Sequence, residues 1–123
     1  MVMILTHLVI RNFNLKGEIV MYYSLLLTKD GLKNAIMKFD LPKDKVDKKI
    51  SEFKSGDVFN VDGYQLRADQ ITRIKIVESE LTSAQILDKL NASIPAGCLV
   101  FYTNKSIFED NKFVKDVTDD FLD

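Results

Sequence analysis

One aromatic ring and three cations lie close together in the sequence and are the residues best suited to hold a ligand. They are Tyr64, Arg67, Arg73 and Lys75. An aromatic ring stacks on a nucleotide base, and guanidinium or ammonium groups form charge-assisted hydrogen bonds with phosphate. The group therefore predicts a site for a small anionic nucleotide. The structural alternative is that Tyr64 packs in the core while the cations pair on the surface with acids, namely Asp57, Asp69 and Glu78.

The other reactive residue types form no catalytic or metal-binding motif. His7 is the only histidine and Cys98 the only cysteine, whereas an activated nucleophile needs a neighbouring base and zinc needs several such ligands. The five separated glycines match no phosphate-binding loop. The carboxylates near the end of the chain lack the spacing of a calcium loop, and we interpret them as a solvated acidic end: Asp116, Asp119, Asp120 and Asp123. We predict no catalytic residue, no cofactor and no metal.

Composition limits the partners. The chain has 123 residues, of which 46% are hydrophobic, enough for one domain with its own core. Its 17 basic and 18 acidic residues nearly cancel, so no overall field attracts a nucleic acid polymer or an anionic membrane. Residues 21–56 are basic and 57–123 acidic, which we interpret as solvated faces. A lone cysteine favours the cytoplasm.

The first 20 residues have two interpretations. Residues 1–10 are apolar, but no basic residue precedes them as in a signal peptide, and they fall short of the roughly 20 residues that span a bilayer. They either form an edge strand or belong to a translated leader over 1–20. The leader hypothesis rests on Lys16-Gly17-Glu18, whose codons can resemble a bacterial ribosome-binding sequence, upstream of Met21. The domain itself is predicted over 21–123.

A hairpin is predicted around Asp62-Gly63, which suits the two positive-φ positions of a type I′ turn. The predicted register pairs Val61 with Tyr64, Asn60 with Gln65 and Phe59 with Leu66. Further elements follow from apolar periodicity. They are strands over 21–28, 35–41, 72–77 and 98–102, and helices over 43–55 and from Thr82 to Pro95.

The first of these strands has apolar residues at both its odd and its even positions, which predicts a central strand buried on both faces. Thr82 and Gln85 predict a capping box at the start of the second helix. Cys98, in the last predicted strand, is interpreted as inert core packing. The element order predicts an α+β domain, with a mostly antiparallel sheet and two main helices on one face.

Four short motifs in this order resemble a known module. They are Phe39-Asp40-Leu41, Phe59-Asn60-Val61-Asp62-Gly63, Ile71-Thr72-Arg73-Ile74-Lys75-Ile76 and Val117-Thr118-Asp119-Asp120-Phe121. They are similar to the small N-terminal accessory module of bacterial TIR-like, predicted nucleotide-binding proteins associated with antiviral defence. In that family a glycine-rich linker and an effector domain follow the closing motif. The resemblance therefore implies that catalysis belongs to the effector, and it carries over no catalytic residue.

Two main hypotheses on function result. The first is a non-enzymatic interaction or regulatory module with a protein partner, either free-standing or part of a defence effector; it predicts an exposed apolar patch. Self-association is compatible with it. The second is a sponge or sensor, phage-encoded in one version, that binds a small anionic nucleotide in a concave pocket lined by Tyr64 and Arg67 or Arg73. A small hydrolase with a buried carboxylate cluster is a third, minor hypothesis.

Overall fold

The computed structural model describes residues 11–31, 33–56, 58–61 and 63–123, apart from the side chain of Phe59. His7 and the predicted edge strand over residues 2–10 lie outside this part. The elements, in chain order, are β1 (Tyr22–Lys29), β2 (Ile36–Leu41), α2 (Lys43–Lys54), β3 (Val58–Val61), β4 (Tyr64–Arg67), the 3₁₀ turn η1 (Ala68–Gln70), β5 (Ile71–Ser79), α3 (Ser83–Ala92), the 3₁₀ turn η2 (Asn104–Phe108), β6 (Lys115–Asp116) and α4 (Thr118–Leu122). The predicted α+β class is confirmed. The main sheet is antiparallel with the strand order β2-β1-β5-β6, and β3 and β4 form a separate hairpin.

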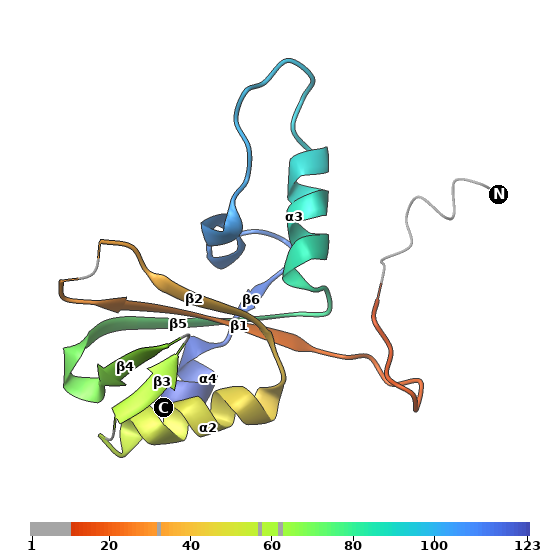
Figure 1. The fold of residues 1–123 in the computed structure, drawn as a ribbon. Helices are drawn as coiled ribbons and strands as arrows, with labels where there is room; N and C mark the ends of the chain where they lie inside the picture. Colours follow the sequence, from red (N-terminus) through yellow and green to blue (C-terminus); the bar gives the residue numbers. More distant parts are fainter. Residues whose placement is uncertain (1–10, 32, 57, 62) are drawn as a thin grey trace.

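The central strand β1 explains how the layers are arranged. Leu25 and Leu27 pack with α2, the hairpin and α4, whereas Leu26 packs on the other side with α3 and η2. The two helices accordingly lie on opposite faces of the sheet (Figure 1). The prediction that both cover one face is wrong. Because β1 is apolar at both parities, each face needs its own cover.

Helix α2 packs through a narrow apolar seam, defined by Val46, Ile50 and Phe53. Val46 and Ile50 are buried, and Phe53 packs against the same core. The spacing of four and three residues puts these side chains on one stripe of the helix. Charged residues occupy the helix surface on both sides of the seam. Gly56, at φ +78°, follows the helix end and turns the chain into the hairpin.

The hairpin has the predicted register, with Val61 opposite Tyr64 and Phe59 opposite Leu66. Val61 and Leu66 are buried in the core under the sheet. Tyr64 is 47% exposed, so the alternative that places its ring in the core is wrong. Gly63 has the positive φ of +81° that the predicted turn requires. Its neighbour Asp62 lies outside the described residues, and with it the full turn type.

The start of α3 is fixed as predicted. The Thr82 hydroxyl accepts from the Gln85 amide N–H at 3.2 Å, and the Gln85 side chain accepts from the Thr82 N–H at 2.9 Å. Asp40 adds a contact that the sequence did not reveal: its carboxylate accepts from the N–H and the hydroxyl of Ser83, both at 2.7 Å. Asn12 reaches the same end of the helix, donating to Gln85 Oε1 at 2.8 Å.

One prediction for the C-terminal third is wrong, and a second is incomplete. Residues 98–102 form no strand; β5 pairs instead with the two-residue strand β6, Val77 opposite Asp116. The carboxylates of the acidic end are exposed, as predicted, but the segment is not all solvated, because Val117 is buried and the ring of Phe121 lies 5.7 Å from that of Tyr23. These apolar residues hold α4 against the sheet.

Candidate functional site

The predicted ligand residues are divided between two places. Arg73 and Lys75 stand two residues apart on β5 and line a cavity of about 490 Å³. Acidic groups from the C-terminal segment line it too, namely Asp116, Asp119 and Asp120. Lys75 Nζ lies 4.0 Å from Asp116 Oδ2. An anion bound here would meet carboxylates as well as cations.

Asp116 is held in its ionised form at this place. Partial burial acts to raise its pKa, but hydrogen bonds from the Thr118 hydroxyl and N–H and the nearby charges of Lys75 and Arg73 outweigh it. The net result is a pKa below the ordinary aspartate value. Asp116 thus serves as the local counter-charge of the two β5 cations.

Tyr64 and Arg67 remain on the hairpin. Arg67 Nη2 lies 2.7 Å from Asp69 Oδ2, and both side chains are about two-thirds exposed. This is one of the surface pairs that the structural alternative predicted. Neither Tyr64 nor Arg67 is among the residues lining the cavity of Arg73 and Lys75. The structure brings together Arg73 and Lys75, but it does not bring all four residues into one site.

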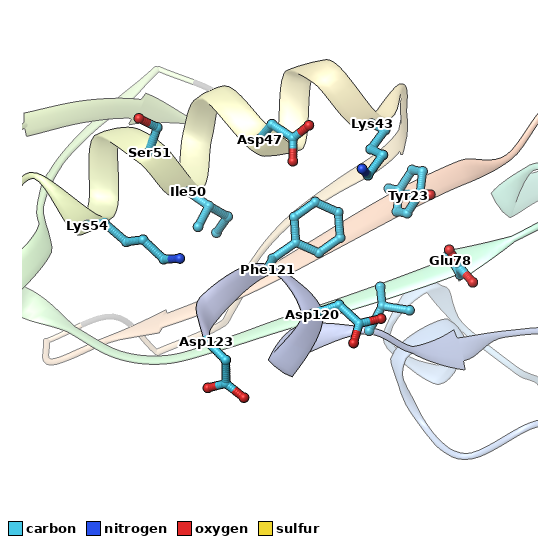
Figure 2. Close-up of a pocket in the computed structure, with 11 residues that line it drawn as sticks. Tyr23, Lys43, Asp47, Ile50, Ser51, Lys54, Glu78, Asp120, Phe121 and Asp123 are labelled. Atoms are coloured by element: carbon cyan, nitrogen blue, oxygen red, sulfur yellow. The ribbon is translucent and has the colours of Figure 1, made fainter.

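Two further cavities flank α2, one on each side of its apolar seam. The first, which we call the acidic cavity, has a volume of about 500 Å³ and lies between α2, α4, β1 and β5. Figure 2 shows Phe121 and Ile50 pointing toward each other between α2 and α4, with charged side chains around them. These charges are Lys43, Lys54, Asp47, Glu78, Asp120 and Asp123. Carboxylates therefore outnumber cations in its lining.

Tyr23 responds to this negative environment. Burial raises the pKa of its hydroxyl, and the carboxylate of Glu78, as a charge and as a hydrogen-bond acceptor, and that of Asp47 raise it further. The raised pKa keeps this hydroxyl neutral at ordinary pH. The Tyr23 ring meets the ring of Phe121 edge to face in the acidic cavity.

The second cavity, which we call the basic cavity, has a volume of about 550 Å³ and lies between α2, β2 and β3. Lys45, Lys48 and Lys49 enter it from α2 at the i, i+3, i+4 spacing of a single helix face, and Lys38 enters from β2. Among the described lining residues Glu52 is the one acid. Apolar side chains form its floor, namely Leu25, Leu41 and Val61.

The basic cavity was missed because the lysines of α2 were interpreted as a solvated face. The signal that could have found it is the hairpin, which follows α2 immediately. Its first strand returns along the helix, and Lys49 Nζ donates to the carbonyl of Asn60 on β3. A basic helix face beside a returning strand encloses space, whereas the same face on an isolated helix does not.

A third feature is an apolar segment, Cys98–Tyr102, in the long connection between α3 and η2 (Figure 1). Leu99 is 89% exposed, Val100 75% and Phe101 71%. Cys98 is exposed as well, so its interpretation as core packing is wrong. Five consecutive apolar residues in solvent require an explanation, because isolated exposed apolar residues are common but contiguous ones mark contact surfaces.

Comparisons with known proteins leave the site to be argued from geometry. No family model, no curated protein and no solved structure matches this chain. The resemblance to the accessory module of TIR-like proteins therefore stays a prediction. In the part of the chain that the structure describes, no group of His, Cys, Asp or Glu is arranged to hold a metal ion. None of the helices described there has the length and hydropathy to cross a membrane.

Proposed function

We propose that the chain is a non-enzymatic interaction module and that its docking element is the apolar segment Cys98–Tyr102. The single observation that carries the proposal is the exposure of three consecutive large apolar residues, Leu99, Val100 and Phe101. Leaving such side chains in water forgoes about 25 cal/mol for each Å² that a partner would bury. The interaction hypothesis predicted an apolar surface of this kind.

The backbone of the segment indicates how a partner would bind. Its ends are held: the Cys98 N–H donates to the Pro95 carbonyl at 3.3 Å, and the Tyr102 N–H donates to Asn91 Oδ1 at 2.7 Å. Between them, residues 99–101 make no backbone hydrogen bond to any part of the chain that the structure describes. Apolar side chains with open backbone groups suit an added β-strand, which satisfies both needs.

The partner that fits best is the same segment of a second copy. The sequence of 98–102 is typical of a strand, yet none of the strands in the described part of the chain pairs with it. No charged residue occurs between Leu90 and Asn104, so two copies meet without charge repulsion. Antiparallel pairing about Val100 places Leu99 opposite Phe101 of the second copy, and the twofold arrangement closes as a dimer.

Sedimentation equilibrium in reductant tests this proposal over a range of protein concentrations. We expect the wild type to dimerise with concentration and Leu99→Ser/Phe101→Ser to stay monomeric. Phe13→Ser/Leu15→Ser is the matched control, because it removes the same two residue types from other exposed positions; this control should dimerise like the wild type. In the dimer, amide hydrogen exchange of residues 99–101 should slow.

Three results would overturn the proposal. A wild type that stays monomeric at millimolar concentration would exclude the second copy as the partner. A dimer in which residues 99–101 exchange as fast as in the monomer would exclude strand pairing. Binding of the monomer to phosphatidylcholine vesicles, lost in Leu99→Ser/Phe101→Ser, would assign the segment to a lipid surface. We expect no such binding, because open backbone groups are costly in hydrocarbon.

A further inference from the structure

We propose that the basic cavity is a binding site for a small organic phosphate, a nucleotide-like anion that combines an apolar or planar body with at least two negative charges. This inference is independent of the apolar segment, which lies on the other face of the sheet beyond α3 (Figure 1). It also places the anion site at residues other than the four that the sequence suggested.

Charge is the first argument. Lys45, Lys48 and Lys49 share one helix face, and like charges at i, i+3 and i+4 spacing repel each other. In the described part of the chain, neither Lys45 nor Lys48 forms an ion pair. A polyanion in the cavity would remove this repulsion and take several charge-assisted hydrogen bonds from ammonium groups. Lysine suits phosphate as a compact point charge with rotatable donors.

The shape and the floor of the cavity give the second argument. A volume of about 550 Å³ is typical of sites for small molecules. Leu41 is half-buried and Val58 is 54% exposed, and these two side chains offer an apolar surface beside the lysines, backed from the core by the buried Leu25 and Val61. Inorganic phosphate alone would leave that apolar surface exposed to water. A ligand with an apolar or planar body covers it and presents its charges to the rim at the same time.

The position of the lysines argues for a small ligand over a nucleic acid polymer. The cations of the basic cavity converge from α2 and β2 on one half-open cavity, whereas a polymer is tracked by cations spread along a groove. Across the seam, α2 presents Lys43 and Lys54 to the acidic cavity, where Asp47 and other carboxylates face them. The side of α2 that faces the basic cavity is therefore the one that favours an anion.

Isothermal titration calorimetry with the full chain tests the site, and ATP, pyrophosphate and adenosine are the probes. ATP should bind most tightly, pyrophosphate more weakly because it cannot cover the floor, and adenosine not measurably. Lys45→Gln/Lys48→Gln should weaken ATP binding about tenfold or more, since it removes two charge-assisted contacts. Lys43→Gln/Lys54→Gln is the matched control: it removes the same charge from the same helix on the acidic flank and should change the affinity less than about twofold.

Each contrary result overturns the proposal. If ATP does not bind at millimolar concentration, the cavity is not a site of this class. Equal loss in both double variants would mean that ATP senses only the net charge of the surface. Pyrophosphate binding as tight as ATP would remove the role of the apolar floor. A short single-stranded DNA that binds more tightly than ATP would assign the lysines to a polymer. Glutamine keeps the helix propensity of lysine, and circular dichroism checks that both variants are folded.

Discussion

Helix α2 separates two cavities of nearly equal size and opposite charge. The acidic cavity holds about 500 Å³ and the basic cavity about 550 Å³. In the described lining of the acidic cavity, two lysines face four carboxylates; in that of the basic cavity, four lysines face one. Both rest on apolar residues of the same core. The two cavities are thus alike in size, and they differ most in the charge of their lining.

The difference shows how one helix determines two surfaces. The acidic cavity is lined from α2 by residues 43, 47, 51 and 54, and the basic cavity by residues 45, 48, 49 and 52. The seam of Val46, Ile50 and Phe53 runs between these two sets. Overall charge is therefore a poor guide to this protein, because a net charge of −1 averages over two opposite local fields.

The largest expected effect comes from truncating a buried side chain of the apolar seam. Ile50 is 4% exposed and packs under the sheet. Ile50→Ala should lower the free energy of unfolding by about 2–4 kcal/mol, since it removes buried methyl groups and leaves a void. Urea denaturation measures it. Lys45→Ala, on the exposed surface of the same helix, should change stability by no more than about 0.5 kcal/mol. Comparable losses in the two variants would mean that α2 is not anchored through its seam.

A smaller effect is expected at the turn that holds the wall of the basic cavity. Gly63 has a φ of +81°, which a β-branched residue adopts only with strain. Gly63→Val should cost about 1–3 kcal/mol. Gln65→Val is the control, because it places the same side chain at an exposed position of β4 with an ordinary strand partner. If both variants unfold at the wild-type urea midpoint, the positive φ of Gly63 is not needed for stability.

The sequence predicted the elements best where short-range signals act alone. The capping box at Thr82 and the register of the hairpin depend on residues at most a few positions apart, and both are as predicted. The central position of β1 followed from its apolar residues at both parities. The same apolar residues also explain why helices cover both faces of the sheet.

The predictions that failed concern contacts between segments that are far apart in the sequence. Residues 98–102 have the composition of a strand, but strand pairing is a property of two segments, and the edge of β5 is taken by β6. The basic cavity likewise exists only because β3 returns along α2. The structural alternative placed Tyr64 in the core, yet the hairpin leaves it half-exposed. Periodicity identifies a face, and only tertiary contacts decide what covers it.

The smallest expected effect is a change in the pKa of Tyr23, which depends on the electrostatic field of the acidic cavity. Its raised pKa favours the neutral hydroxyl in the folded state. This contribution to stability is complete below the ordinary tyrosine pKa of about 10 and is lost as the pH rises through the folded value. Glu78→Gln removes a negative charge beside the hydroxyl, so the pKa of Tyr23 should fall toward its ordinary value while burial keeps it raised. Ultraviolet absorbance of the phenolate measures the shift, and Tyr23→Phe identifies the share of this residue in the titration.

Glu52→Gln makes the same change in the basic cavity and should leave the Tyr23 titration as it is. A shift of equal size from both variants would show that Tyr23 senses the overall charge of the protein, and the two flanks of α2 would then not differ in local field.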